Sequence, residues 1–241
     1  MCGRFVVAGA AADLVALFDV DLPADQLPGP SWNIAPTDQV PIILDSIPKG
    51  DDAGDPPVRR LESARWGLVP SWAKDIKVGV TAFNARIESA AEKPHFATAV
   101  KKRRALVPAT GYYEWRTVDG VKTPHFIHLP DGELLVFAGL YEWWRNPAEG
   151  DDSPNKWVLS TSILTREAAS ELATIHERRP VFLSPELIEE WVDPHTEGTV
   201  ELLDEVSAGG VEQAERVEFY EVDRAVGNVR NNSPQLMEPI A

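Results

Sequence analysis

The residue with the clearest chemical potential is Cys2, the only cysteine in 241 residues and one peptide bond from the start of the chain. Removal of Met1, which a small second side chain favours, would leave an α-amine and a thiol on one residue. Such a 1,2-aminothiol attacks an aldehyde through nitrogen to give an imine, and sulfur then closes a thiazolidine ring. An α-amine titrates at about pH 8 and a thiol at about pH 8.5, so we expect a reactive fraction of each at neutral pH. The alternative is a small buried hydrophobic residue, the commoner role of a lone cysteine.

Glu114 lies among aromatic residues and could transfer protons. On an extended segment Tyr112, Glu114 and Arg116 point one way, and Tyr113 and Trp115 point the other way. Desolvation by aromatic neighbours holds the proton of a carboxyl to higher pH. A surface salt bridge to Arg116 explains the same spacing equally well.

His176 is a second candidate for proton transfer. It follows a predicted helix and precedes Arg178, Arg179 and a strand-forming segment at 181–183. A histidine titrates near neutral pH and can pass protons in either direction. A satisfied polar residue at the end of a helix is the ordinary alternative.

Many short elements must position these residues. The apolar patterns predict strands and helices, and Thr165 is expected to cap the helix at 166–173. Asp119-Gly120 and Asp131-Gly132 are hairpin signals, which together predict three consecutive antiparallel strands. The predicted strands cover residues 4–8, 39–44, 59–66, 103–107, 122–129, 133–144, 157–163 and 217–222, and the predicted helices cover 11–20, 94–100, 166–173 and the stretch from 185 to 203.

Length and composition predict one globular domain over residues 1–241, with exposed loops at 45–58 and 146–155. The chain has no run of eighteen apolar residues and no basic stretch followed by an apolar one, so we expect neither a membrane span nor a secretory signal. One cysteine excludes an internal disulfide and favours a reducing, cytoplasmic compartment. His125 and His128 face opposite sides of a strand, and no clustered ligand set predicts a metal or another cofactor.

The charge of the chain is −15 and unevenly distributed. The segment 186–223 holds thirteen acidic residues against one base, whereas residues 93–116 hold six bases against one acid. Overall acidity argues against a nucleic-acid partner, because neutralising phosphates takes Lys and Arg. The basic run and the excess of arginine over lysine leave such a partner open, although a solvated basic face is the commoner reason for such a run.

Seven blocks in order give the chain a family resemblance: residues 1–5, 33–36, Trp66-Gly67 with Pro70 and Trp72, 84–86, 111–115, Ile175-His176 with Arg178 and Pro180, and 226–229. Together they resemble the SOS-response-associated peptidase (SRAP) domain, which includes sensors of abasic sites in single-stranded DNA. The resemblance covers nearly the whole chain. It implies an α+β fold, irregular and mostly antiparallel, in which a barrel-like sheet is surrounded by short helices.

The resemblance also implies roles. Cys2 would bond covalently to the aldehyde of the abasic site, Asn84 would hold the N-terminal amine, Glu114 would handle protons during ring opening and imine formation, and His176 would assist proton transfer and reversal. Arg86 and Arg178 would grip phosphates. The further candidates near the DNA groove are Arg4, Asn33, Pro36, Trp66, Trp72 and Thr165. The implied partner is single-stranded DNA with abasic sites, at strand junctions as well, in a nucleoid-associated DNA damage response. No oligomeric state is indicated.

Two other functions fit the same residues. A peptidase with an N-terminal nucleophile would use Cys2, Glu114 and His176 to cut peptide bonds, and its substrate could be its own Met1. A noncovalent module would recognise single strands or junctions through Arg and Trp alone.

Overall fold

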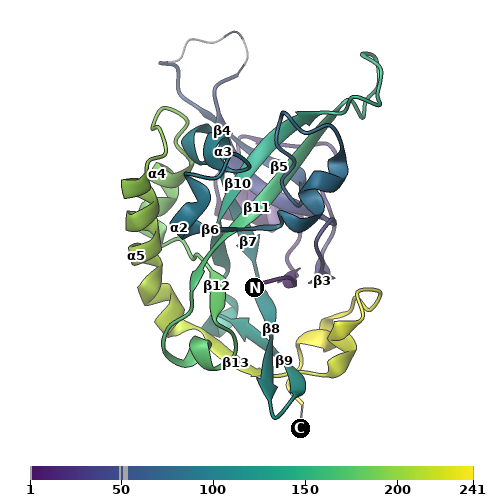
Figure 1. Ribbon diagram of the computed structural model, residues 1–241, viewed down its shortest axis with the longest axis vertical. Coiled ribbons are helices and arrows are strands. Elements are labelled where there is room, and N and C mark those ends of the chain that lie inside the picture. Colours follow the sequence, from purple (N-terminus) through teal and green to yellow (C-terminus); the bar gives the residue numbers. More distant parts are fainter. Residues whose placement is uncertain (1, 49, 51–53, 241) are drawn as a thin grey trace.

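The computed structural model describes residues 2–48, 50 and 54–240, and it combines short strands with short helices (Figure 1). The strands are β1 (Phe5–Val7), β2 (Leu22–Pro23), β3 (Ser31–Ile34), β4 (Gln39–Ser46), β5 (Val58–Trp66), β6 (Asn84–Arg86), β7 (Arg104–Ala109), β8 (Gly111–Val118), β9 (Val121–His128), β10 (Leu135–Arg145), β11 (Trp157–Glu167), β12 (Arg178–Pro180) and β13 (Glu218–Glu221). The α-helices are α1 (Ala11–Leu17), α2 (Ile87–Ala90), α3 (Ala97–Lys102), α4 (Ile188–Val192) and α5 (Val200–Arg216). The 3-10 helices are η1 (Ile76–Thr81), η2 (Pro130–Gly132), η3 (Ser170–Thr174), η4 (Pro185–Leu187), η5 (Arg224–Gly227) and η6 (Pro234–Met237).

A closed barrel forms the larger part of the fold. Its strands run in the order β11-β10-β7-β4-β5, and β5 pairs in parallel with β11 to close the ring. Strand β12 extends the sheet beside β11, β2 extends it beside β5, and β6 pairs in parallel with β11. This arrangement confirms the expected barrel-like α+β fold. It also places β6, and therefore Asn84, beside the closing strand.

A second sheet of five strands, in the order β13-β9-β8-β1-β3, lies below the barrel in Figure 1. The β8–β9 hairpin turns at Asp119-Gly120, where both residues have positive φ (51° and 79°), as the hairpin signal predicts. The prediction for Asp131-Gly132 is wrong. These residues belong to η2, which carries the chain from one sheet to the other, so β9 and β10 do not pair.

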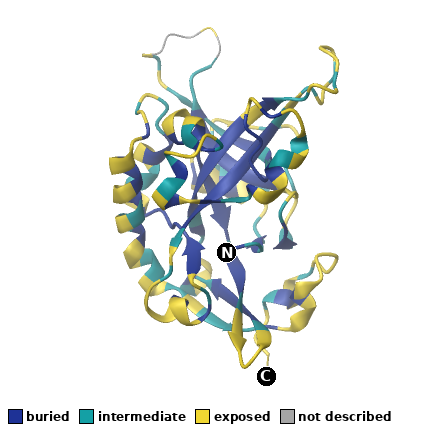
Figure 2. Ribbon diagram, in the orientation of Figure 1, coloured by how far each residue is buried: buried dark blue, intermediate teal, exposed yellow. Residues whose placement is uncertain are grey.

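The main core fills the barrel, whose strands are largely buried (Figure 2), and it extends to β1 through Phe5 and Val7. Phe5 contacts Trp66 edge-to-face with ring centroids 4.9 Å apart, and the ring centroid of Phe137 lies 6.2 Å from that of Phe5. Burying three such aromatic rings contributes several kcal/mol. This packing fixes the start of the chain against both sheets, and Cys2, three residues before Phe5, is buried with it.

The Trp66-Gly67 motif has a structural explanation. Gly67 adopts a φ of 137°, and a Cβ there would lie 2.5 Å from the carbonyl oxygen of Gly79. Only glycine combines that backbone conformation with that close approach. The motif therefore seats η1 against the end of β5.

The segment after β11 departs from expectation. The sequence predicts that Thr165 caps a helix over 166–173, but Thr165 lies inside β11, opposite Pro180 of β12. Strand pairing overrides the helical pattern there, and only the short η3 follows. The acidic segment 186–223 does form η4, α4, α5 and β13, and α5 exposes much of its outer surface (Figure 2).

The two predicted loops differ in how far they can be followed. Residues 146–155 connect β10 to β11 and are mostly exposed, as predicted. In the other loop, β4 continues to Ser46 and β5 begins at Val58, and residues 49 and 51–53 lie outside the described residues. Within the described part of the chain, no helix is both long and apolar enough to cross a membrane.

Candidate active site

The barrel and the second sheet bring Cys2 and Asn84 into contact. Cys2 precedes β1 and is fully buried, and its carbonyl oxygen accepts a hydrogen bond of 2.6 Å from Asn84 Nδ2. Asn84 opens β6, which is held by its parallel pairing with β11, where Asn84 is aligned with Ile163. Strand pairing therefore fixes the amide that holds the first residues of the chain.

Glu114 faces the same site from β8, with only 4% of its surface exposed. Burial raises the pKa of Glu114 above that of an ordinary carboxyl, and the charge of His176 acts in the opposite direction. Burial also raises the pKa of the Cys2 thiol, and the negative charge of Glu114 raises it further. These couplings show that Cys2, Glu114 and His176 share one electrostatic environment.

The expected thiolate fraction on Cys2 is therefore wrong. Sequence reasoning used the pKa of an exposed thiol, whereas this thiol is desolvated and lies near a carboxyl group. Its Sγ atom lies 3.9 Å from the carbonyl oxygen of Arg4, to which the S–H donates weakly. At neutral pH the sulfur carries its proton, and any reaction at sulfur must move that proton elsewhere.

His176 lies in the turn between η3 and β12 and is partly exposed. The backbone N–H of Arg178 donates to His176 Nδ1 over 2.9 Å. The same Nδ1 atom lies 3.2 Å from the carbonyl oxygen of Arg178, so both backbone groups of Arg178 engage this nitrogen. The turn therefore holds the His176 ring in place through Nδ1.

Arg178 does not project into solvent. Its guanidinium forms two hydrogen bonds to the carboxylate of Glu88, of 2.8 and 2.9 Å, and a third of 2.7 Å to the carbonyl oxygen of Thr165. A phosphate that took up this guanidinium would have to replace Glu88. Arg86, the last residue of β6 and aligned with Thr165, is exposed.

Three of the expected groove residues are buried and structural. The Trp66 indole donates to the carbonyl oxygen of Phe83 over 2.8 Å, and the Thr165 hydroxyl lies 3.4 Å from the carbonyl oxygen of Ala85. Asn33 is 3% exposed. None of these three side chains is open to solvent in this conformation, and their direct contact with DNA stays a prediction.

Asn33 and Arg4 instead fasten the C-terminal segment. The amide nitrogen of Asn33 donates to the carbonyl oxygens of Val226, Asn228 and Asn231. Arg4 donates to Asn33 Oδ1 and to the carbonyl oxygen of Val226, each over 2.7 Å. The block at 226–229 is therefore anchored to β1 and β3 by side chains that the sequence assigned to DNA.

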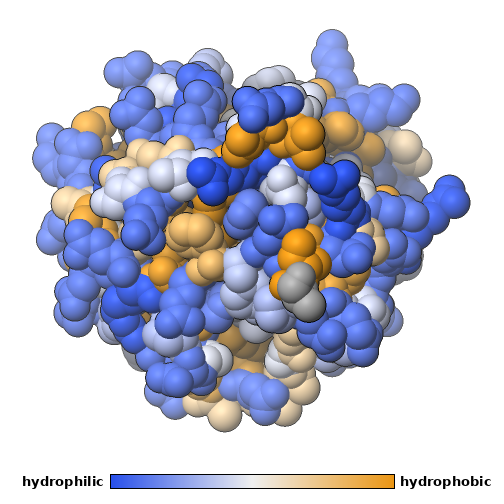
Figure 3. Space-filling model, turned by 90° about the horizontal axis from the view of Figure 1, so that it is seen from below, coloured by the Kyte–Doolittle hydropathy of each residue, from blue (hydrophilic) through white to orange (hydrophobic). Residues whose placement is uncertain are grey.

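Two further candidates reach the surface. Trp72 is 61% exposed and meets the ring of His95 edge-to-face at 6.1 Å, and Pro36 is partly exposed. Seen from below, the molecule shows mostly hydrophilic side chains, which divide its apolar groups into separate patches (Figure 3). An exposed indole on a polar surface suits base stacking.

The basic run at 93–116 does not form a free basic face. Lys101 pairs with Glu197 and Arg103 pairs with Glu142. Arg104 is buried, and it donates to the backbone carbonyl oxygens of Trp191, Val100, Lys101, Asp193 and Thr196. Much of the run therefore stabilises the fold.

Glu88 is a site residue that the sequence did not indicate. It belongs to α2, yet it engages Arg178 ninety positions later. The hydrogen bonds and charge of Arg178 outweigh burial and lower the pKa of Glu88. Spacing along the chain carries no signal for such a pair, because tertiary folding alone brings α2 beside β12.

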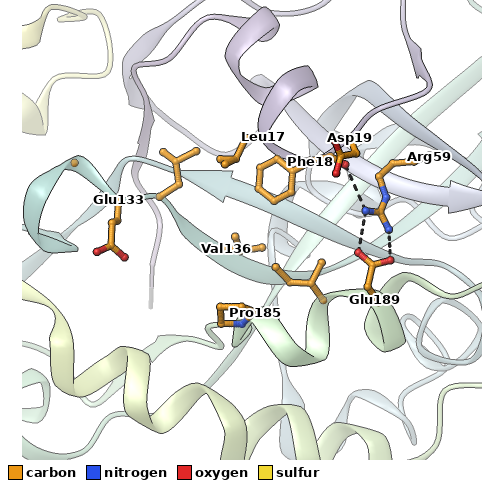
Figure 4. Close-up of a pocket in the computed structure, with 11 residues that line it drawn as sticks. Leu17, Phe18, Asp19, Arg59, Glu133, Val136, Pro185 and Glu189 are labelled. Atoms are coloured by element: carbon orange, nitrogen blue, oxygen red, sulfur yellow. Dashed lines mark hydrogen bonds and ion pairs between the residues drawn. The ribbon is translucent and has the colours of Figure 1, made fainter.

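The described residues contain no group of three or more His, Cys, Asp or Glu side chains placed to hold a metal ion. A separate pocket of about 520 Å³ lies between α1, α4 and the start of β10 (Figure 4). None of the candidate site residues lines it; its wall includes Phe18, Val136 and the Arg59–Glu189 ion pair.

The fold and the N-terminal site define a class, that of barrel-containing α+β proteins in which Cys2 is buried beside titratable groups. The SOS response associated peptidase (SRAP) family model matches residues 1–229, and the chain belongs to that family. Abasic site processing protein YoqW of Bacillus subtilis is 35% identical over 99% of both chains. Abasic site processing protein YedK of Escherichia coli is 31% identical over 100% of both.

Solved structures agree with the fold. A protein from Bacteroides thetaiotaomicron superposes with a TM-score of 0.79 at 20% identity over 100% of both chains. A phage-related protein of Bordetella bronchiseptica, 29% identical, gives a TM-score of 0.66 over 92% of this chain and 95% of its own. The resemblance inferred from the seven blocks is confirmed.

Proposed function

We propose that this protein processes abasic sites in single-stranded DNA by forming a thiazolidine crosslink through Cys2. Its relatives of similar length are named abasic site processing proteins. The observation that carries the proposal is the convergence of Cys2, Asn84, Glu114 and His176, which come from four separate parts of the chain. Removal of Met1 supplies the α-amine that the reaction requires.

The reaction has three steps. The open form of an abasic deoxyribose presents an aldehyde at C1′, which the Cys2 nitrogen attacks to give a carbinolamine. Loss of the hydroxyl as water leaves an imine. Sulfur then adds to the imine carbon while the thiol proton passes to the imine nitrogen, which closes the ring without net gain or loss of a proton.

Glu114 is the proton carrier for these steps. Its raised pKa increases the fraction of carboxylic acid at neutral pH, and that acid donates to the departing hydroxyl. The carboxylate so formed then accepts the N–H proton of the iminium, which leaves the neutral imine. The protonated Cys2 thiol suits ring closure, because it brings with it the proton that the imine nitrogen needs.

His176 and Asn84 hold the reactants. His176 passes a proton to or from a sugar oxygen, which favours ring opening and, in the reverse direction, release. Asn84 fixes the Cys2 carbonyl and so orients the adjacent amine. Orientation of this kind reduces the barrier by avoiding the entropy loss of bringing the groups together.

DNA is held by a small number of exposed groups. Arg86 serves a phosphate beside the lesion and Trp72 a neighbouring base, while Arg178 takes up a phosphate only by releasing Glu88. An undamaged strand offers no aldehyde, so discrimination comes from the chemistry. Because noncovalent binding rests on contacts to phosphates, we expect its affinity to fall with salt.

Incubation of the mature protein with an oligonucleotide containing one abasic site tests the proposal. A band that survives boiling in detergent, with the mass of both components less one water, supports it. Salt-sensitive binding without that band supports a noncovalent module. Cleavage of peptides would favour the peptidase function, which the protonated thiol disfavours because a cysteine peptidase attacks as thiolate.

A further inference from the structure

The ion pair between Glu88 and Arg178 joins a half-exposed carboxylate to a buried guanidinium. The Arg178 side chain is 9% exposed, whereas the Glu88 side chain is 50% exposed. Hydrogen bonds of 2.8 and 2.9 Å run from Nη1 and Nη2 of Arg178 to the two carboxylate oxygens. Glu88 therefore covers the guanidinium in the bidentate geometry that a phosphate also adopts with arginine.

Arg104 provides a comparison, because it is a buried arginine with a purely structural role. Its Nε, Nη1 and Nη2 atoms all donate to backbone carbonyl oxygens. Arg178 has one carbonyl partner, that of Thr165 at 2.7 Å, and its Nε atom is buried without a hydrogen-bond partner among the described residues. The backbone thus satisfies Arg104, whereas Arg178 depends on an anion.

Arg86 lies close to this pair along the chain and in the sheet. It is the last residue of β6, two positions before Glu88, and it is exposed. Strand β6 aligns Arg86 with Thr165, whose carbonyl oxygen accepts the hydrogen bond from Arg178. A phosphate bound by Arg86 therefore arrives beside the guanidinium that Glu88 covers. Since Glu88 is already half-exposed, its carboxylate can return to water without being buried elsewhere.

Resting on the proposed function, we propose that Glu88 determines which anions reach Arg178. It occupies the phosphate position on the guanidinium and releases it only to a phosphate held by the rest of a DNA strand. A carboxylate tethered to the chain has a high effective concentration, which a free anion in solution does not match. A strand phosphate is tethered as well, through Arg86, Trp72 and the reacting sugar. Glu88 therefore excludes free anions such as inorganic phosphate, and it also weakens the binding of DNA.

The exchange of one anion for another also bears on the turn that carries His176. Both backbone groups of Arg178 engage His176 Nδ1, at 2.9 and 3.2 Å. Because Arg178 is paired before and after the exchange, this turn keeps its place while DNA enters. Without Glu88 the guanidinium would be buried and unpaired until DNA arrived, which destabilises a fold. Glu88 therefore stabilises the free protein while it opposes DNA binding.

The test compares Glu88→Gln with Glu92→Gln, which removes the same charge from an exposed position just after α2. Noncovalent binding to an oligonucleotide with a reduced, unreactive abasic sugar is measured in inorganic phosphate and in chloride of equal ionic strength. We expect Glu88→Gln to bind about tenfold more tightly than wild type in chloride, the order expected for loss of one charged competitor. Phosphate should weaken that binding in Glu88→Gln alone. Urea unfolding should show that Glu88→Gln is less stable than wild type.

Two further variants sharpen the comparison. Glu88→Asp keeps the charge but is one methylene too short for the bidentate contact; it serves if Glu88→Gln does not fold, and it should give smaller effects in the same directions. Adding Glu88→Gln to Arg178→Gln should not tighten binding, because the exchange requires the guanidinium.

Three results would overturn the proposal: weaker DNA binding by the Glu88 variants, a gain no larger than that of Glu92→Gln, or tighter binding that phosphate leaves unchanged. Each readout is noncovalent and does not depend on crosslinking. Failure of the wild-type protein to crosslink would instead refute the proposed function.

Discussion

Two polar clusters near the N-terminus contain similar residues but are built differently. The first joins Arg4 and Asn33 to the segment 226–231, and the Asn33 side chain makes direct hydrogen bonds to backbone carbonyls and to Arg4. The second joins Cys2, Glu114 and His176, whose mutual charges perturb the pKa of the thiol and the carboxyl. The first cluster gains stability from satisfied donors, whereas burial in the second raises the pKa of both the Cys2 thiol and the Glu114 carboxyl.

The types of residue do not distinguish the two clusters, but their surroundings do: the first has a structural role and the second a chemical one. Buried donors that meet backbone carbonyls are engaged for the lifetime of the fold. Acidic groups whose pKa is raised by burial make the folded state less stable at high pH, and such sites are frequently functional. Substitutions in the first cluster should change folding, and those in the second should change reactivity.

The largest effect is expected from Cys2→Ala. The remaining amine forms only a reversible imine, so the adduct that survives boiling in detergent should disappear while the folded protein is retained. Denaturing electrophoresis and intact mass measure this. An undiminished stable adduct from the variant would show that sulfur is not involved. The reactive role of the second cluster would then be refuted.

Asn33→Ala should act on the first cluster alone. Removing its side chain leaves three backbone carbonyls and Arg4 without that partner, which we expect to cost on the order of 3 kcal/mol of unfolding free energy. Urea unfolding measures the loss. At low temperature, where the variant is folded, its crosslinking rate should match that of wild type. A reduced rate in the folded variant would instead place Asn33 in the reactive site.

Glu114→Gln should slow adduct formation about 100-fold, because glutamine keeps the shape but cannot transfer a proton. Noncovalent affinity for an oligonucleotide with a reduced, unreactive abasic sugar should stay near that of wild type. Measuring rate and affinity on the same two proteins separates proton transfer from DNA binding. Equal losses in both would count against proton transfer.

Glu114→Gln should slow the reaction but make the folded protein more stable at alkaline pH. Since the pKa of Glu114 is raised in the folded protein, the stability linked to its proton is present at acid pH and is lost as the pH rises through the folded value. Glu114→Gln should therefore be more stable than wild type at pH 8, and this advantage should shrink towards pH 4. Thermal unfolding across that range measures it, and a constant difference would exclude the raised pKa.

The smallest effect is expected from Arg86→Gln. Loss of one phosphate contact should weaken noncovalent binding uniformly across sequences and reduce the slope of log affinity against log salt by about 0.7, the value for one contact to a single strand. Lys122, exposed on the far end of the β8–β9 hairpin, provides a control through Lys122→Gln. An unchanged slope for Arg86→Gln would remove Arg86 from the DNA interface.

Several features of the protein follow from its sequence alone. The order of the seven blocks determined the family, and with it the barrel-like fold and the candidates Cys2, Asn84, Glu114 and His176. The Asp119-Gly120 hairpin was also predictable, because two residues with positive φ suffice to set it. Local chemistry of this kind depends on neighbours in the chain, which the sequence states directly.

Tertiary structure alone decided the rest. The parallel pairing of β5 with β11, the burial of Asn33, Trp66 and Thr165, and the alignment of His125 with Glu114 all depend on residues that are not neighbours in the chain. The sequence shows the same residue type whether a polar or aromatic side chain lies in the core or on a DNA-facing surface. Its role depends on the partners that folding brings to it. For this protein the sequence determined which reactive groups are present, and the fold determined which of them meet.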